Sequence, residues 1–350
     1  MNVTRQTWTA VVSALFFVIL AAALAFVPVP YVIYSPGRAY NVLGDNAANQ
    51  PIIQISGIQS HQTSGQLFMT TVAVTRSSGR VGLGEALVAY WGPARDALPR
   101  DAVYTQGKSD EQVRTEEQLL MDTSKQDAVV AALRQADVPV HPMPVVASVS
   151  VAGPAHEKLQ PGDLIESVNR QPVATPDDVR RIIRAAAPGD EVSLDIVRDR
   201  QPLNVRLSSD LSGQSRSAVI GITVDTGYSY EPRIDFGVGR DIGGPSAGLV
   251  FALAVYDRIT PKDLLNQRSV AGTGTINSDG KVGPIGGIQE KVDGAQAAGA
   301  QVFLVPAANC RDLAGVKTTM TLIRVDTLDS AIRSLDALAD PAQQGQLPHC

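Results

Sequence analysis

The longest apolar run of the chain extends from Trp8 to Val27 and contains no charged side chain. As a helix, about 20 such residues match the hydrocarbon thickness of a bilayer, and prolines at positions 28 and 30 end the run. Arg5 on the short leading end favours a cytoplasmic N-terminus. Residues 1–30 are therefore predicted to be a single-pass transmembrane anchor, with the rest of the chain outside the cytoplasm. Small residues late in the run leave a cleaved signal peptide as the alternative.

The remaining chain alternates between strand-like and helix-like patterns. Short β-branched runs between Gly and Pro turns predict a β-rich N-terminal region with a helix over 31–123, and within its residues 31–107 we find no candidate chemistry. Residues 124–210 are predicted to form a second domain, because Thr175-Pro-Asp-Asp starts a capped helix between two strand patterns. Strands alternate with helices again over 215–340, which gives an α/β (α+β) class, and residues 341–350 form a tail.

A break rich in glycine precedes a segment that is apolar on every face. Residues 249–256 (Leu-Val-Phe-Ala-Leu-Ala-Val-Tyr) predict a buried helix, and Pro245 suits its first turn. Ser246 is therefore expected at or near a helix N-terminus, where free backbone N–H groups favour a developing oxyanion. Gly244, Pro245 and Ala247 form the candidate oxyanion and nucleophile loop. A serine that only caps the helix is the alternative.

A second candidate residue lies about 45 positions further along the chain. The apolar positions from Ile288 to Ala295 follow a helical stripe, and Lys291 falls on it, whereas Glu290 and Asp293 point elsewhere. Burial lowers the pKa of a lysine and leaves a neutral amine that can act as a base. The alternative is a lysine at the edge of the stripe whose ammonium group reaches solvent.

Gly244-Pro-Ser-Ala-Gly248 also fits G-x-S-x-G, the nucleophile elbow of α/β-hydrolases. That interpretation requires an acid and then a histidine after the serine. Of the four histidines, only His349 follows Ser246, and it is the penultimate residue. A Ser–His–acid triad, and with it an esterase, is therefore disfavoured, so the base must be another group.

Three segments together resemble the proteolytic domain of the Lon family. They are Gly244–Gly248, Gly272-Thr-Gly274 and Val282–Lys291, and the resemblance spans roughly residues 215–340. It implies the fold of that domain and a hydrolase that cleaves peptide bonds.

The resemblance implies a role for each matching residue. Ser246 would be the nucleophile of a Ser–Lys dyad and Lys291 its general base, and Thr273 would hydrogen-bond the lysine and orient it. ATP-dependent Lon proteins usually carry Asp directly before Gly-Pro-Ser. Here Gly243 takes that place and Asp241 lies two residues earlier, which puts a role for an acid beside the nucleophile in doubt.

Leu159-Gln-Pro-Gly-Asp-Leu-Ile165 resembles the core of a PDZ domain of the bacterial protease-associated type. Such a domain binds an extended peptide by strand addition between one helix and one strand. The family's apolar–Gly–apolar carboxylate loop should precede the strand at Val145, where this chain has Val140-His-Pro-Met-Pro144 and no glycine. Peptide binding and a role as spacer or gate therefore both remain open.

Composition mainly excludes functions. A net charge of −5 and the lack of a Lys/Arg-rich run with aromatics give no argument for nucleic acid. No C-x-x-C or HExxH spacing occurs, so neither a metal site nor a cofactor is expected. Gly274–Lys281 misses the P-loop spacing, so nucleotide binding is not expected either. Cys310 and Cys350 could pair outside the cytoplasm, and two free thiols are the alternative.

The order anchor, PDZ domain and Lon-like domain resembles membrane-anchored bacterial proteases of the SepM/YlbL type. It implies an ATP-independent serine endopeptidase that cleaves extended or unfolded peptides or proteins on the outer side of the cell membrane. Self-association is implied as well, since Lon-type domains usually form rings. The alternative is a proteolytically inactive membrane scaffold whose PDZ domain recruits partners. The presence of Ser246, Lys291 and Thr273 together favours the protease.

Overall fold

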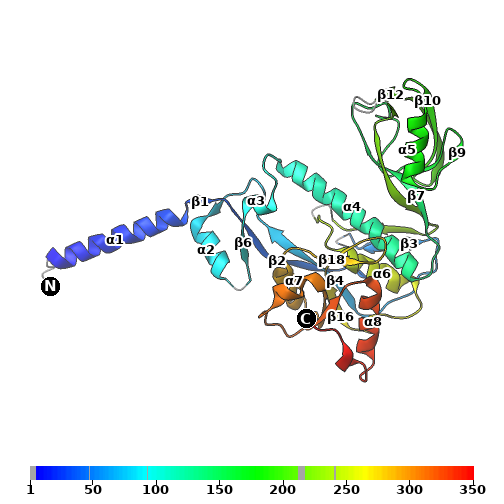
Figure 1. Ribbon diagram of the computed structural model, residues 1–350. Coiled ribbons are helices and arrows are strands. Elements are labelled where there is room, and N and C mark those ends of the chain that lie inside the picture. Colours follow the sequence, from blue (N-terminus) through cyan, green and yellow to red (C-terminus); the bar gives the residue numbers. More distant parts are fainter. Residues whose placement is uncertain (1–4, 47, 93, 212–216, 240–241) are drawn as a thin grey trace. The chain divides into compact units, whose positions relative to one another are not determined.

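The computed structural model describes residues 5–46, 48–92, 94–211, 217–239 and 242–350 (Figure 1). The chain forms two compact units, one made of residues 1–136 together with 233–350 and the other of residues 137–232. The second unit is therefore an insertion in the sequence of the first. This division differs from the predicted domains, because the segments before and after the insertion belong to one unit.

A six-stranded sheet is the centre of the first unit, in the order β20-β19-β16-β4-β2-β6. Its strands are β2 (Tyr31–Asn41), β4 (Gln66–Val74), β6 (Asp96–Pro99), β16 (Ser269–Gly272), β19 (Val302–Pro306) and β20 (Thr321–Val325). Strands β4, β16, β19 and β20 run parallel, whereas β2 is antiparallel to both β4 and β6. Because β4 pairs with β16, the N-terminal segment completes the sheet of the C-terminal segment and is no separate module.

Helices pack around this sheet. Three of them contact its strands, α6 (Gly248–Ile259), α7 (Ile288–Ala297) and α8 (Leu328–Ala339), and α4 (Asp110–Gln135) packs against α6. Ser109 and Gln112 form a capping box that starts α4. Leu249 to Val255 of α6 are fully buried, which confirms the predicted buried helix. Helix α7 lies so close to β2 that a Cβ at Gly294 would fall 2.7 Å from the backbone oxygen of Gly37.

Shorter elements complete the first unit. They are β1 (Pro28–Val29), β3 (Ile53–Ser56), β5 (Val81–Gly82), α2 (Leu83–Trp91), α3 (Arg100–Val103), β15 (Arg233–Phe236), β17 (Thr275–Ile276), β18 (Val282–Gly283), η1 (Ala307–Leu313) and η2 (Gln344–Gln346). Strands β1 and β5 pair, as do β3 and β15, and β17 and β18.

The second unit is built on the sheet order β11-β10-β8-β7-β14, with β9 paired to β8. Its elements are β7 (His141–Val149), β8 (Leu164–Val168), β9 (Gln171–Pro172), α5 (Pro176–Ala185), β10 (Glu191–Arg198), β11 (Gln201–Ser208), β12 (Asp210–Leu211), β13 (Ala218–Val219) and β14 (Ile222–Ser229). Thr175 caps α5 as predicted, and Val179, Ile182 and Ile183 form the buried face of this helix.

The edge of this second sheet differs from the sequence interpretation. Residues 141–144 are no loop, since they lie in β7 and pair with β14. The apolar–Gly–apolar pattern occurs instead at Ile220-Gly221-Ile222, where Gly221 has a φ of 78° and leads directly into β14. The side chain of Arg180 joins α5 to this strand, because its Nη2 donates to the backbone oxygen of Val224 at 2.6 Å.

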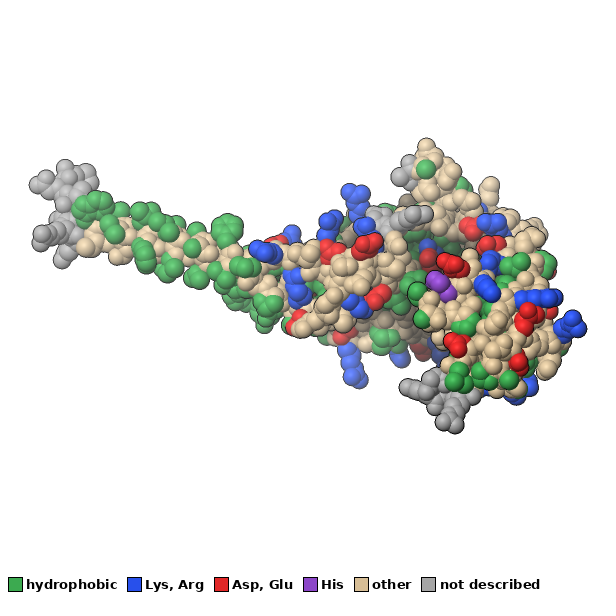
Figure 2. Space-filling view, turned by 90° about the horizontal axis from the view of Figure 1, so that it is seen from above, with side chains coloured by type: hydrophobic (Ala, Val, Ile, Leu, Met, Phe, Trp, Pro, Cys, Tyr) green, Lys and Arg blue, Asp and Glu red, His purple; other side chains and the backbone are tan. Residues whose placement is uncertain are grey.

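The N-terminal helix α1 spans Arg5–Ala25. Residues Thr7–Ala25 have a mean hydropathy of 2.4 and are long and apolar enough to cross a membrane, by length and composition. Figure 2 shows the apolar side chains that coat this helix, and none of its described part is buried against the protein. A membrane span and a signal sequence both fit these properties.

Candidate active site

Ser246 lies in the turn that leads into α6, as expected from the apolar segment that follows it. Gly244 makes this turn possible, because its φ of 85° is a left-handed conformation that glycine adopts without strain. The backbone oxygen of Ser246 accepts two hydrogen bonds, from the N–H of Gly274 at 2.9 Å and from the hydroxyl of Thr273 at 3.0 Å. The segment after β16 therefore fixes the backbone of the candidate nucleophile.

Lys291 lies in the first half of α7, and its side chain is only 3% exposed. Gly287 precedes the helix with a φ of 67°, and a Cβ there would fall 2.7 Å from a methyl group of Val72. The prediction that Lys291 faces inward is confirmed. The accompanying expectation for Glu290 is wrong, because this side chain is also buried, at 2% exposed.

The structure brings the serine and the lysine together. Lys291 Nζ lies 3.0 Å from Ser246 Oγ and also donates to the backbone oxygen of Thr70 at 3.0 Å. The three groups come from α7, from the turn before α6 and from β4. This distance is within hydrogen-bond reach of a nucleophile and its base.

Burial changes the acid–base properties of the lysine. Desolvation lowers the pKa of Lys291 from 10.5 to about 8, although the neighbouring carboxyl of Glu290 acts in the opposite direction. With this pKa, about a tenth of the amines are neutral at pH 7, which is roughly 300-fold more than for an unperturbed lysine. The amine can therefore accept a proton near neutral pH.

Thr273 is close to the dyad but does not contact the lysine in the expected way. Its hydroxyl donates to the backbone oxygen of Ser246, and its own N–H donates to the oxygen of Leu304 at 3.3 Å. The expected hydrogen bond to Lys291 is replaced by one that holds the serine backbone. The hydroxyl of Thr273 thus contacts the Ser246 backbone and not the Lys291 amine.

The three residues of the candidate oxyanion loop differ in what they can donate. The N–H of Gly244 is already bonded to the backbone oxygen of Glu117 at 2.9 Å, and Pro245 has no N–H. Among the residues that the structure describes, the N–H groups of Ser246 and Ala247 have no hydrogen-bond partner. These two remain to hold an oxyanion. Asp241, whose role the sequence leaves in doubt, lies outside the described residues.

The dyad opens into a cleft of about 1000 Å³. Its lining includes residues from β2, β4 and α4, among them Tyr34, Thr70 and Glu117, as well as Ser246 and Lys291. Partial desolvation raises the pKa of the Glu117 carboxyl, which has no ion pair within the described part of the chain. The sequence of residues 31–107 gives no signal for this contact, because Thr70 accepts from Lys291 through a backbone oxygen that any residue type carries.

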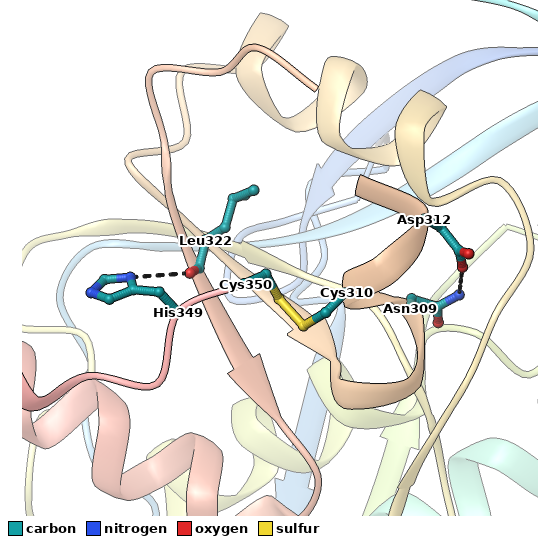
Figure 3. The surroundings of a disulfide bond; sticks show 6 residues. All are labelled: Asn309, Cys310, Asp312, Leu322, His349 and Cys350. Atoms are coloured by element: carbon teal, nitrogen blue, oxygen red, sulfur yellow. Dashed lines mark hydrogen bonds between the residues drawn. A yellow bond between two sulfur atoms is a disulfide. The ribbon is translucent and has the colours of Figure 1, made fainter. Parts of the chain in front are cut away.

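A disulfide joins η1 to the C-terminal residue (Figure 3). Cys310 and Cys350 are bonded, 40 residues apart in sequence. Beside this bond, the side chain of Asn309 exchanges two hydrogen bonds with the backbone of Ile285, both at 3.0 Å. Ile285 lies in the short loop 284–287 that leads to α7, so the cross-linked η1 supports the segment that carries Lys291.

Comparisons with known proteins fall on two parts of the chain. Residues 237–337 match the Lon protease (S16) C-terminal proteolytic domain, and residues 145–198 match the PDZ domain family. Lon protease 2 of Herpetosiphon aurantiacus is 36% identical over 113 residues, which is 31% of this chain and 13% of that protein. Lon protease 1 of Myxococcus xanthus is 35% identical over 140 residues, or 39% of this chain and 17% of that protein. The chain thus spans less than a fifth of the length of these relatives.

Among solved structures, the PDZ domain of an SdrC-like protein from Listeria monocytogenes is 22% identical. The match covers 23% of this chain and 86% of the Listeria chain, with a TM-score of 0.23.

Proposed function

Because the chain carries a Lon-type proteolytic domain and a PDZ domain, we propose that it is a serine endopeptidase with a Ser–Lys dyad. Ser246 is the nucleophile and Lys291 is the general base. The observation that carries this proposal is the 3.0 Å distance between Lys291 Nζ and Ser246 Oγ at the floor of a cleft, combined with the lowered pKa of the lysine.

The reaction follows from these positions. The neutral amine of Lys291 takes the proton of the Ser246 hydroxyl while Oγ attacks the peptide carbonyl. The N–H groups of Ser246 and Ala247 hold the oxyanion, and loss of one such donor typically costs roughly 10²–10³ in rate. The lysine then gives its proton to the leaving amine, and the C–N bond breaks. The same amine then takes a proton from a water molecule, which attacks the acyl carbon. The bond from that carbon to Oγ breaks, and the lysine returns the proton to Oγ.

The proposed setting is the outer side of a membrane. Helix α1 is long and apolar enough to anchor the chain, and the Cys310–Cys350 disulfide favours an oxidising compartment. No P-loop occurs in the 350 residues, so we propose that cleavage needs no ATP and acts on extended or already unfolded segments. The compartment can be tested with a maleimide reagent on intact cells, which should label the cysteines only after reduction.

We assign the PDZ unit the recruitment of extended peptide segments by strand addition. The support is that β14 is the edge strand of the sheet in the described part of the chain and follows the glycine turn at Gly221. The Arg180 side chain would have to release the backbone oxygen of Val224 for a peptide to lie between β14 and α5.

The dyad can be tested with the full chain in detergent micelles, given unfolded casein without ATP. We expect Ser246→Ala and Lys291→Met each to lower cleavage by more than about 10³-fold, because each removes a member of one reacting pair. Lys317→Met is the matched control, since this lysine is exposed and lies outside the cleft.

Two results would contradict the proposal. Equal cleavage by the parent protein and all variants would exclude the dyad. Absence of cleavage by a folded parent protein would instead favour the scaffold alternative, in which the PDZ unit binds partners and the proteolytic domain is inactive.

A further inference from the structure

Helix α2 exposes most of its large apolar side chains. Leu87 is 39% exposed, Val88 67%, Tyr90 71% and Trp91 75%, whereas only Ala86 and Ala89 are buried. Single exposed apolar residues are normal on a protein surface. A cluster of this density on a nine-residue helix instead indicates a surface that a membrane or another molecule covers.

The exposed face has a definite direction. Gly84, Leu87, Val88 and Trp91 follow the spacing i, i+3, i+4, i+7 and therefore share one face of the helix. The first of them touches the end of α1, since a Cβ at Gly84 would lie 3.0 Å from the Cβ of Ala25. The apolar face of α2 is thus continuous with the apolar surface of the candidate membrane span.

Backbone hydrogen bonds fix this arrangement. Strand β1, which follows α1, pairs with β5, which directly precedes α2. The N–H of Leu83 donates to the backbone oxygen of Val27 at 2.8 Å, and a Cβ at Gly82 would fall 2.7 Å from the backbone oxygen of Ala25. Helix α2 is therefore held at the last turn of α1 and is not carried on a free linker.

The charges near α2 suit a lipid surface. Arg80 precedes the helix in the sequence and Arg95 follows it, and both are exposed and have no ion pair within the described ranges. The only charged residue of the helix, Glu85, falls outside the apolar face. Tyr90 and Trp91 have amphipathic rings, which are enriched where hydrocarbon meets headgroups.

We propose that α2 is an interfacial helix that lies in the membrane surface beside the end of α1. Leu87, Val88 and Trp91 enter the boundary between headgroups and acyl chains, and Arg80 and Arg95 contact lipid phosphates. The proposal rests on the anchoring role of α1 in the proposed function. Its occupant is the bilayer itself, because the apolar face begins where the span ends.

The position of α2 also affects the cleft. Asp96, five residues after Trp91, pairs with Tyr34, which lines the cleft. An interfacial α2 therefore keeps that strand pair close to the lipid surface. Tyr34 thus links the lining of the cleft to the strand that follows α2.

The test uses Trp91 as a probe in the full chain. The sequence has two tryptophans, so Trp8→Phe leaves Trp91 as the only one, and Ser246→Ala makes the measurement independent of catalysis. The protein is placed in vesicles of phosphatidylcholine and phosphatidylglycerol with bromine on the acyl chains. We expect the emission of Trp91 to be quenched about twofold or more, with bromine near the headgroup more effective than bromine near the bilayer centre.

Two further variants give the matched comparison. Val88→Glu places a charge in the apolar face and is expected to reduce the quenching, whereas Glu85→Gln lies outside the face and should leave it unchanged. Circular dichroism checks that both retain the helix content of the parent protein. Equal quenching in Val88→Glu and its parent, with equal helix content, would contradict the proposed face.

The remaining outcomes separate this proposal from the proposed function. If the protein floats with the vesicles but Trp91 is unquenched and accessible to iodide, the anchor stands and the interfacial helix is wrong. If Trp91 is shielded from iodide yet unquenched by bromine, a second copy or another protein covers α2, and the proposal is overturned. If the protein does not float at all, the anchoring role of α1 fails and this inference fails with it. None of these results depends on cleavage.

Discussion

The cleft has two walls that come from different parts of the chain. The motif wall, from residues 237–337, supplies the side chains of Ser246, Lys291 and Thr273. The N-terminal wall, from residues 31–136, supplies a backbone oxygen to each side of the dyad. Thr70 accepts from the lysine amine, and Glu117 accepts from the N–H of Gly244 in the nucleophile loop. One wall therefore carries the proposed nucleophile and base, and the other accepts hydrogen bonds from the lysine and from the nucleophile loop.

This difference between the walls bears on the proposed role of Lys291 as a base. A lysine in water keeps a pKa near 10.5 and is almost entirely protonated at neutral pH. The pKa of Lys291 is lowered to about 8 by burial, and β4 of the N-terminal wall is part of what buries it. The chemistry of the motif wall thus depends on a region that contains no recognisable motif.

Removal of the N-terminal wall is the most severe test of this comparison. A fragment of residues 233–350 retains Ser246, Lys291 and Thr273 but loses β4, so β16 loses a parallel neighbour and the amine loses the Thr70 oxygen. We expect no cooperative thermal transition and no detectable cleavage of casein. A fragment of residues 28–350, which lacks only α1, is the control. Cooperative melting of the short fragment with normal cleavage would show that the motif wall is sufficient.

Thr273 tests positioning within the motif wall. Thr273→Val removes the hydroxyl that bonds to the Ser246 backbone oxygen, and we expect kcat to fall by about 10- to 100-fold with little change in KM, as for a small misplacement of a reacting group. Thr273→Ser keeps the hydroxyl and should restore most of the rate. Full activity of Thr273→Val would contradict a positioning role for the Thr273 hydroxyl.

The pH profile tests the effect of burial on the base. Because the neutral amine is the active form and the pKa of Lys291 is lowered to about 8, activity should rise with pH through that value. The neutral fraction predicts an increase in kcat/KM of about tenfold between pH 7 and pH 9. The measurement uses a fluorogenic peptide and buffers of constant ionic strength. A profile that is flat or falling over this range would contradict the assignment of Lys291 as base.

The sequence locates the serine and the lysine that the structure places 3.0 Å apart, whereas their catalytic roles stay a prediction. A nucleophile, a buried base and a glycine turn require particular residue types at particular spacings, so Ser246, Lys291 and Gly244 can be identified from their neighbours. The partner of the Thr273 hydroxyl could not be identified in this way. A resemblance gives a residue type, whereas the choice between the lysine amine and the Ser246 carbonyl depends on distances that only the fold sets.

The predicted domain division shows a second limit. Strand β4 has an ordinary strand pattern, and nothing in residues 66–74 indicates that its partner is β16, about 200 residues later in the chain. Parallel pairing leaves no turn signal, because the partners are never joined by a hairpin. The glycine turn at Gly221 shows a different limit. The expected pattern precedes the strand that begins the PDZ unit, β7, whereas the structure has it before β14, which comes later in the chain and pairs with β7.

The smallest expected effect concerns a contact between the walls. The buried hydroxyl of Ser124 on α4 donates to the backbone oxygen of Pro245 at 3.0 Å, next to the nucleophile. Ser124→Ala removes this bond and should lower the free energy of unfolding by about 1 kcal/mol, read from urea-unfolding midpoints of the full chain in micelles.

Thr123→Ala is the matched control for this contact. Its exposed hydroxyl donates only within α4, to the oxygen of Leu119, so we expect a change within about 0.5 kcal/mol. The two variants remove similar hydroxyls from adjacent positions on one helix. A larger loss of unfolding free energy for Ser124→Ala is therefore specific to the bond with Pro245. Equal losses would mean that the N-terminal wall supports the nucleophile loop only through the Glu117 oxygen and packing.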